Sequence, residues 1–453
     1  MKRCKVQSIA LILALATMPG LTTHIFAQSQ TSTTSDRSTE LGKVDQLEQQ
    51  AFKLHQKGKY NDATLLLERV ILIRKRILGD RHLDVVRGLG SLAALYSEQG
   101  RYDKAEPLFI QVLDIKKLLL GNRNASFVDS LYSLAALYTE QGKYQKAEPL
   151  FVQALELRQS ILGDKHPDIA LSMNGLAGLY LSQGRYEKAE PLYIKSLELR
   201  KLILGDKDPN VASSMNSLAG LYLSQGLYKK AEPLYIKSLE IRKSIFGDQN
   251  PYVGVTLNDL ATLYKVQGRY KEAEVLYVQA LEIRKIVYGN QHPHVATSLN
   301  NLVLLYRSQG KYEKAEVLLT QVLDILKFNF GDRHPNIASA LDNLAGVYEL
   351  QGRSAKAEPL RLKSVESRKL ILGDRHPDFA VGLNNLALLY SGQGKFEQAE
   401  PLLVKALEIY KSLSGYRNTN VAASLTGLAG IYHAQGRYDK ARFLQRYDRF
   451  NVR

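Results

Sequence analysis

The side chains best suited to chemistry in this sequence are histidines and aspartates that recur at regular intervals. Five histidines occupy equivalent positions, and an aspartate stands two residues before four of them: His82, His166, His292, His334 and His376, with Asp80, Asp164, Asp332 and Asp374. Imidazole and carboxylate are both zinc ligands, so a row of metal sites is conceivable. Loops of neighbouring helical repeats, however, lie about one helix diameter apart, roughly 10 Å, which is too far for one shared ion. We therefore interpret these residues as turn and helix-cap residues and expect no bound metal.

Catalytic motifs are missing from the sequence. It contains no phosphate-binding GxxxxGK[ST] or GxGxxG motif, and no HExxH, GxSxG or CxxC motif. Its most regular carboxylates recur at one interval, which favours a role in a scaffold: Glu106, Glu148, Glu190 and Glu232. We therefore expect a non-enzymatic protein that needs no cofactor.

The interval shared by all these residues is 42 residues, and glycines mark it from one end of the chain to the other. They are Gly58, Gly100, Gly142, Gly184, Gly226, Gly268, Gly310, Gly352, Gly394 and Gly436. A fixed period of this length is typical of a stacked array, in which each unit buries its apolar face against its neighbours. The sequence therefore predicts about ten repeats.

Each repeat is predicted to contain two helices, as the unit of residues 169–210 illustrates. Apolar residues such as Leu176 and Tyr180 recur at steps of three and four, which indicates one face of a helix. Gly184 ends this helix, because glycine adopts a left-handed cap conformation without steric cost. A second helix with its own apolar face follows and ends at Gly205.

The N-terminal region has the features of a secretory signal peptide over residues 1–27, with a basic start, a short apolar run and a cleavage site after Ala27. Residues 28–40 are polar and rich in Ser and Thr, which predicts a disordered spacer. The repeats then fill residues 41–453. Cleavage would remove Cys4, the only cysteine, so we expect an exported chain, periplasmic or secreted, that needs no disulfide. An uncleaved N-terminus is the alternative.

The sequence carries a formal net charge of +16, and the excess is spread over the repeats. Many basic residues lie near the predicted end of a second helix, for example Arg200, Lys201, Arg242 and Lys243. We interpret them as complements to the negative end of the helix dipole. The alternative is attraction to an anionic surface or an acidic partner.

The pattern LAxLYxxQGxYxKAExLY resembles the tetratricopeptide repeat, and the strings LNNLA and GDxHP with the 42-residue length resemble the kinesin light chain type. The resemblance covers about residues 45–450. It implies an all-α, right-handed superhelical solenoid of about ten antiparallel helix pairs. It also implies that the first helices line a concave groove that binds peptides or protein segments. The long coiled coil of light chains has no counterpart in residues 28–46.

Laid over this fold, one column of the first helices points into the groove: Asn174, Asn216, Asn258, Asn300, Asp342 and Asn384. Asparagine is a poor helix former, so these residues indicate another purpose. Side-chain amides can bind the backbone of an extended peptide. The alternative is that they bond to the neighbouring repeat and hold the stack together. Nearby, Lys265 and Arg307 are candidates for binding a partner's carboxylate.

The eighth repeat departs from the pattern, with Ser354 in place of the loop tyrosine and Arg361 at a buried aromatic position. Lost aromatic burial predicts a locally weak joint there.

Taken together, the sequence predicts a protein-interaction scaffold that binds protein or peptide segments in its concave groove. Some of these partner segments are expected to carry acidic groups. Two alternatives stay open. One is a binder of polyanions such as nucleic acid or anionic glycans, although nucleic acid is not favoured. The other is an intracellular adaptor of the kinesin light chain type with an uncleaved N-terminus.

Overall fold

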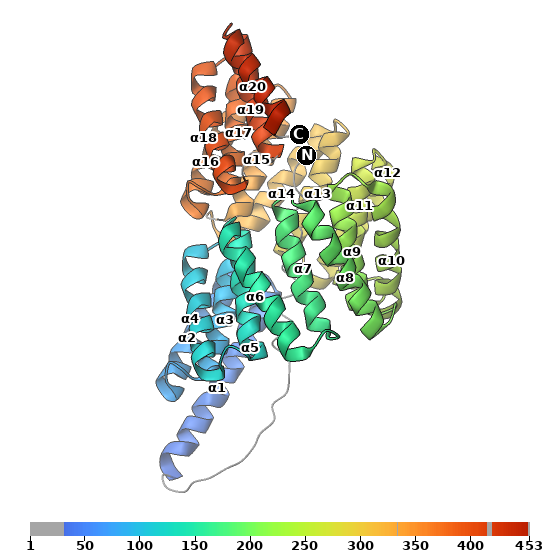
Figure 1. Ribbon diagram of the computed structural model, residues 1–453. Coiled ribbons are helices and arrows are strands. Elements are labelled where there is room, and N and C mark those ends of the chain that lie inside the picture. Colours follow the sequence, from blue (N-terminus) through green and yellow to red (C-terminus); the bar gives the residue numbers. More distant parts are fainter. Residues whose placement is uncertain (1–30, 333, 415–418, 452–453) are drawn as a thin grey trace.

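The computed structural model describes residues 31–332, 334–414 and 419–451, and in this part of the chain every regular element is an α-helix (Figure 1). The helices are α1 (Thr31–Gln56), α2 (Tyr60–Leu78), α3 (Leu83–Glu98), α4 (Tyr102–Leu120), α5 (Ala125–Glu140), α6 (Tyr144–Leu162), α7 (Pro167–Ser182), α8 (Tyr186–Leu204), α9 (Pro209–Ser224), α10 (Tyr228–Phe246), α11 (Pro251–Val266), α12 (Tyr270–Tyr288), α13 (Pro293–Ser308), α14 (Tyr312–Phe330), α15 (Pro335–Leu350), α16 (Ser354–Leu372), α17 (Pro377–Gly392), α18 (Phe396–Ser414), α19 (Thr419–Ala434) and α20 (Tyr438–Asn451).

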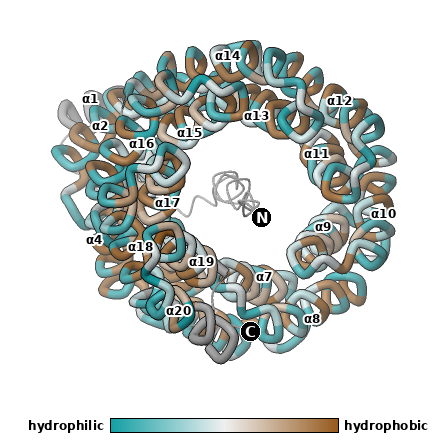
Figure 2. The backbone as a smooth tube through the Cα atoms, turned by 90° about the horizontal axis from the view of Figure 1, so that it is seen from above, coloured by the Kyte–Doolittle hydropathy of each residue, from teal (hydrophilic) through white to brown (hydrophobic). Residues whose placement is uncertain are grey.

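The helices form ten consecutive pairs, each an antiparallel repeat, and the pairs stack side by side. Viewed along the superhelix axis, the odd-numbered helices form the inner ring and the even-numbered helices the outer ring (Figure 2). We call the short loop inside a repeat the A–B loop and the loop between repeats the inter-repeat loop. The predicted all-α solenoid of about ten helix pairs is confirmed.

The glycines end the helices as predicted. At Gly184 the backbone takes a φ of +74°, and the next amide, Arg185 N–H, donates back to the carbonyl of Tyr180 over 2.8 Å. This bond satisfies a carbonyl that the end of a helix leaves without a partner. Gly205 ends α8 with a φ of +80°, and here the glycine's own amide donates to the carbonyl of Lys201.

Small and aromatic residues share the core between the two rings. The alanine near the start of each second helix is fully buried, as at Ala189 and Ala231. Its missing bulk lets the two helices approach closely. A tyrosine recurs at one position of the first helices, and Tyr180 and Tyr222 are each 8% exposed, so this position packs against the core.

Most repeats are joined to the next by a polar unit of three residues at the A–B loop, and its basic member bonds the glutamate of the preceding repeat. In one copy, Tyr180 donates its hydroxyl to Glu148 of the preceding repeat over 3.0 Å, and Arg185 donates to the same carboxylate over 2.9 Å. The Arg185 guanidinium lies 4.6 Å from the centre of the Tyr180 ring, within the range of a cation–π contact. The recurring glutamates are thus part of the scaffold, as the sequence indicated.

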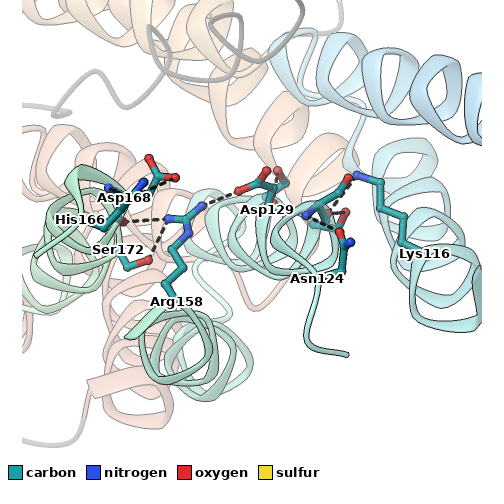
Figure 3. A network of polar contacts seen from close by, with 10 residues as sticks. Lys116, Asn124, Asp129, Arg158, His166, Asp168 and Ser172 are labelled. Carbon is teal, nitrogen blue, oxygen red and sulfur yellow. Dashed lines mark hydrogen bonds and ion pairs between the residues drawn. The ribbon is translucent and has the colours of Figure 1, made fainter. Parts of the chain in front are cut away.

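The arginines near the end of the second helices have a different role from the one predicted. Arg158, drawn in Figure 3, is 4% exposed and donates to the Ser172 hydroxyl, the Asp168 carbonyl and the Asp129 carboxylate. These partners lie on both neighbouring first helices. Arg200, Arg242 and Arg284 make the corresponding bond to a hydroxyl of the next repeat. These arginines are therefore buried connections between repeats.

The lysines beside these arginines stay at the surface. Lys201 and Lys243 form ion pairs with loop aspartates, Asp206 at 3.3 Å and Asp248 at 2.9 Å. Exposed pairs of this kind contribute little to stability, about 0–1 kcal/mol each. The helix-dipole interpretation therefore fits the lysines and fails for the arginines, whose partners are specific hydroxyl and carbonyl groups.

The recurrent loop histidines are N-caps, as predicted. In all five, the imidazole Nδ1 accepts a hydrogen bond from the backbone amide two residues later, as His166 does from Asp168 over 3.2 Å (Figure 3). Such a cap satisfies an amide that the first turn of the helix leaves unpaired. Within the described residues, no group of three or more histidine, cysteine or acidic side chains is placed to hold a metal.

The N-terminal spacer differs from its prediction. Residues 28–40 were expected to be disordered, but α1 already begins at Thr31. The later part of this helix is packed, with Val44 fully buried, and Glu40 pairs with Arg76 of α2. Extending an anchored helix gains one hydrogen bond per residue, whereas starting a new one is costly, which explains the extension. Residues 1–30, which include the predicted signal peptide, lie outside the described residues.

The superhelix also contacts itself. A-B loops of the first repeats meet inter-repeat loops that lie more than five repeats further along the chain. The imidazole Nε2 of His334 is 3.0 Å from the carbonyl of Glu98, and that of His376 is 3.2 Å from the carbonyl of Glu140, each pair 236 residues apart. Successive superhelical turns therefore touch. Among the helices that the structure describes, none is both long and apolar enough to cross a membrane.

Two glycines in α7 offer a direct test of the packing between repeats. A methyl group at Gly175 would lie 2.5 Å from a ring carbon of Tyr132, whereas one at Gly178 would lie 3.6 Å from the Tyr193 hydroxyl. We expect Gly175→Ala to lower the free energy of unfolding by about 1–3 kcal/mol through overpacking. Gly178→Ala should raise it by about 0.5–1 kcal/mol through helix propensity. Urea denaturation measures both, and equal effects of the two variants would contradict this packing.

Candidate interaction surface on the inner helices

The predicted column of polar residues lies on the inner helices, but its side chains are bonded to the neighbouring repeat. Asn216 donates to the carboxylate of Asp259 over 2.6 Å. Asn258 and Asn300 accept from Asn301 over 2.6 Å and from Asn343 over 2.7 Å. Each bond joins residues 43 positions apart. We call this row of bonds, together with the bond between Asp342 and Asn385, the amide ladder.

The partner column of the ladder was not identified from the sequence. It consists of Asp259, Asn301, Asn343 and Asn385. The string LNNLA contains the signal, because its two adjacent asparagines come from the two columns. One turns toward the following repeat and the other toward the preceding repeat. Adjacent residues on a helix point about 100° apart, which lets the pair serve both neighbours.

At its ends the ladder changes partners. Asn174 donates to the Ser214 hydroxyl at 3.5 Å, and Asn384 to the Ser424 hydroxyl at 3.1 Å. One repeat earlier, Tyr132 takes the place of the asparagine and packs edge-on against Phe151, with ring centres 5.1 Å apart. It fills the space left by a glycine in the next repeat. The same inner position thus changes from an aromatic contact to a polar one along the chain.

Asp342 is the most buried member of the column, with 3% of its surface exposed. Its carboxylate forms ion pairs with Arg368 at 2.7 Å and Arg361 at 3.1 Å, and accepts from Asn385 at 2.9 Å. Burial alone would raise the pKa of this carboxyl, but the two guanidinium groups outweigh burial and lower it. Asp342 is therefore charged, and it is held inside the chain by these partners.

This ion-pair cluster also shows what replaces the missing aromatic residue in the eighth repeat. Arg361 occupies the aromatic position, and it is buried between Asp342 and Glu349, to which it donates over 2.8 Å. Aromatic packing is thus replaced by a desolvated charge network. Such networks add little net stability compared with apolar packing. The weaker joint at this repeat stays a prediction.

The two predicted basic residues differ in their surroundings. Arg307 on α13 is half-buried, and its Nε–H has no hydrogen-bond partner within the described chain. Burial lowers its pKa, and so does the nearby positive charge of Arg361. Both guanidinium groups approach Gly346, where an added methyl would lie 3.4 Å from Arg361 and 3.6 Å from Arg307. Lys265, one repeat earlier on α11, is also half-buried.

Sequence comparison gives the family directly. The sequence pattern described as the tetratricopeptide repeat matches residues 47–117, 127–202, 175–244, 210–286, 252–327, 295–369, 336–412 and 378–446. The chain belongs to the tetratricopeptide repeat family. These matches span the helix pairs described above, so the family and the fold agree. No curated protein matches this tetratricopeptide repeat chain in sequence.

Several solved structures are similar to this tetratricopeptide repeat chain. BtubC (BKLC) from P. vanneervenii is 25% identical, with 54% of this chain and 92% of that chain covered and a TM-score of 0.40. A putative kinesin light chain with nearly identical TPR-like repeats from Podosopora anserina is also 25% identical, covering 45% and 97%, with a TM-score of 0.38. A Rap protein complexed with Competence and Sporulation Factor is 14% identical, covering 80% and 96%, with a TM-score of 0.51. The last likeness concerns the fold alone.

The amide ladder can be tested by a double-mutant cycle on Asn300 and Asn343. Either alanine substitution leaves the other, at least half-buried amide without its partner, so each should lower the free energy of unfolding by about 1–3 kcal/mol. The double substitution should cost less than the sum, with a coupling of about 0.5–1.5 kcal/mol. Ser308→Ala, on the exposed end of α13, is the control and should change stability by less than about 0.5 kcal/mol. Strict additivity at the ladder would show that the bond does not hold the repeats together.

Proposed function

We propose that this tetratricopeptide repeat protein is a non-enzymatic scaffold that binds protein or peptide segments along its inner helices. Domains of this family are generally non-catalytic and mediate protein–protein interaction. The observation that supports a specific binding region is Arg307, a half-buried guanidinium with an Nε–H that no residue of the described chain accepts. A cation in this state gains from an anionic hydrogen-bond acceptor supplied by a partner.

Within this proposal, some polar residues of the inner helices support the structure and others contact the partner. Asn258 and Asp342 are buried and bonded inside the chain, so they support the shape of the surface. Asn174, Asn216, Asn300 and Asn384 keep part of their surface exposed. They stay candidates for contact with a peptide backbone, because an amide that makes one bond retains further capacity. Lys265 and Arg307 would bind acidic groups of the partner.

An overall charge of +16 supports a second candidate, the binding of polyanions. The two candidates differ in their dependence on salt. Binding to a polyanion releases counterions, so its affinity should fall steeply and linearly with the logarithm of salt concentration. The affinity for a peptide segment that contacts only one or two cationic side chains should fall much less as the salt concentration rises.

The inner basic pair can be tested by affinity capture with a matched control. Lys265→Ala with Arg307→Ala removes two charges from the inner helices. Lys195→Ala with Lys271→Ala removes two exposed charges from the outer helices α8 and α12. We expect the inner pair to reduce capture of protein partners about tenfold, as the loss of one charged hydrogen bond implies. The outer pair should leave capture unchanged. Equal losses in both variants would favour polyanion binding, and no loss in the inner pair would contradict the proposed site.

We also propose that the chain is exported and loses its N-terminal segment. The basic start, the short apolar run and the small residue Ala27 at the expected cleavage site support this proposal. Intact mass and N-terminal sequencing of the protein from its native cells are expected to give a chain that begins at Gln28. A chain that begins at Met1 and stays in the cytoplasm would instead support an intracellular adaptor.

A further inference from the structure

Among the described residues, three contacts between superhelical turns share one arrangement, and we call these contacts the clasps. In each, a glycine of an A–B loop meets the proline that opens a later inner helix. The pairs are Gly58 with Pro293, Gly100 with Pro335 and Gly142 with Pro377. A methyl group at these glycines would lie 2.8, 2.5 and 2.7 Å from the proline Cδ, so only glycine fits without displacement. The residue before each proline is a histidine.

The second and third clasps use both nitrogens of that histidine. The Nδ1 of His334 accepts from the amide of Asn336 over 3.1 Å, and its Nε2 lies 3.0 Å from the Glu98 carbonyl oxygen. His376 repeats this arrangement with the Asp378 amide at 3.0 Å and the Glu140 carbonyl at 3.2 Å. Only a neutral imidazole with its proton on Nε2 can accept at one nitrogen and donate at the other. We assign this tautomer from the hydrogen bonds.

The first clasp is built from rings. Tyr60 of α2 stacks on Phe330 of α14 with centres 5.3 Å apart, and Phe330 stacks on His334 at 3.9 Å. His292 stacks on Tyr288 at 4.6 Å and lies 4.7 Å from His294. These contacts join the first repeat to the sixth, seventh and eighth.

Charged and titratable groups surround His292 on every side. His55 faces it from α1, Arg284 and Tyr288 from α12, and His294 from its own helix. Burial, together with the charges of His55 and Arg284, lowers the pKa of His292 to about 4. His55 itself is held by the Glu98 carboxylate at 2.6 Å. At the third clasp, Asp378 of α17 and Tyr102 of α4 face the contact.

The loops outside the clasps show what the histidines add. There the N-cap is His82, Asn124, His166, Asp208 or Asn250, so asparagine and aspartate cap these helices as well as histidine does. All three clasp loops have histidine followed by proline. An N-cap needs only one acceptor atom. The second and third clasps also use the second imidazole nitrogen, and the first clasp uses the flat imidazole ring for stacking. The clasp histidines therefore serve a purpose beyond capping.

We propose that the clasps form a reversible, pH-sensitive latch that closes the superhelix on itself at neutral pH and releases it on acidification. A proton on Nδ1 of His334 or His376 would point at the backbone N–H that this atom now accepts from. A proton on His292 would add a charge beside Arg284 and His294. The Asp378 carboxylate, two residues after His376, favours a protonated histidine and so opposes release at the third clasp. The first clasp, where burial disfavours a protonated His292, therefore dominates the response. The latch does not depend on which partner the inner helices bind.

The sign of the pH dependence follows from linkage. Closing the latch buries His292 and lowers its pKa to about 4, so the open form, in which this burial is relieved, binds more protons. The contribution of His292 to closure is fully present above the ordinary histidine pKa of 6.5 and is lost as the pH falls toward 4. From this residue alone, the ratio of open to closed chains should rise by at most about 30-fold between pH 7.5 and pH 5.0.

The experiment measures the distance across the first clasp by double electron–electron resonance. Spin labels are placed at the exposed positions Lys57 and Gln291 in the full chain carrying Cys4→Ser. We expect one short distance at pH 7.5 and a growing longer-distance population down to pH 5.0, with helical content unchanged in circular dichroism. A distance that does not change with pH, or one that changes only as helical content falls, would overturn the latch.

Two sets of variants separate the latch from general acid effects. Asparagine at His292, His334 and His376 keeps the caps and removes the titrating groups, so the pH response should disappear. The same change at His82 and His166, which lie outside the clasps, should leave the response intact. If the clasp variant opens with the same pH midpoint as the unmodified chain, titration of these histidines does not cause the opening.

The second set of variants alters the clasp glycines and is measured at constant pH. Gly100→Ala with Gly142→Ala places methyl groups against the clasp prolines and should open the latch at pH 7.5. Gly268→Ala with Gly310→Ala imposes similar strain, because all four glycines have φ between +69° and +79°. No heavy atom of the described residues lies within 4 Å of a methyl at the control positions. Indistinguishable distances in the two variants would contradict the clasp contacts.

Discussion

The contact on which this structure depends is the one between a residue and the residue 43 positions later, which lies opposite it on the next inner helix. Because the repeat is 42 residues long, every repeat meets its neighbour with the same offset. Asn258 with Asn301 and Asn300 with Asn343 are examples between amides, and His55 with Glu98 is one between an imidazole and a carboxylate. A solenoid has no central core, so its stability is the sum of such nearest-neighbour contacts.

This constraint explains why so many polar groups are buried here. An inner helix is covered by its own partner and by two neighbouring repeats, so its side chains have little access to water. Buried polar atoms must then bond within the chain. Arg242 reaches the Thr256 hydroxyl, and Asp342 is enclosed by two arginines. Polar bonds of defined geometry fix the angle between repeats more narrowly than apolar contacts do. The accumulated angle brings the seventh repeat back onto the first, where α14 contacts α2.

Much of the fold could be predicted from the sequence, because a period repeated ten times averages out local irregularity. The glycine positions indicated the helix ends, and apolar residues such as Leu176 and Tyr180 indicated the buried face. What periodicity cannot show is the partner of a side chain. Arg200 was assigned to the helix dipole from its position, whereas its partner is the Ser214 hydroxyl in the next repeat. The second asparagine of LNNLA was overlooked for the same reason. The clasps depend on the pitch of the superhelix, which accumulates from small angles that no single repeat encodes.

The central claim is that identical spacing makes the repeats interchangeable units that hold each other in place. Its most direct test is to delete residues 227–268, one complete unit, and to compare this chain with one that lacks residues 227–264. The first deletion keeps every neighbouring pair at its 43-residue offset. It should give a folded protein with about one-tenth less helix and a cooperative urea transition. The second should disrupt the junction. If the first deletion unfolds the chain, or both deletions behave alike, the account is wrong.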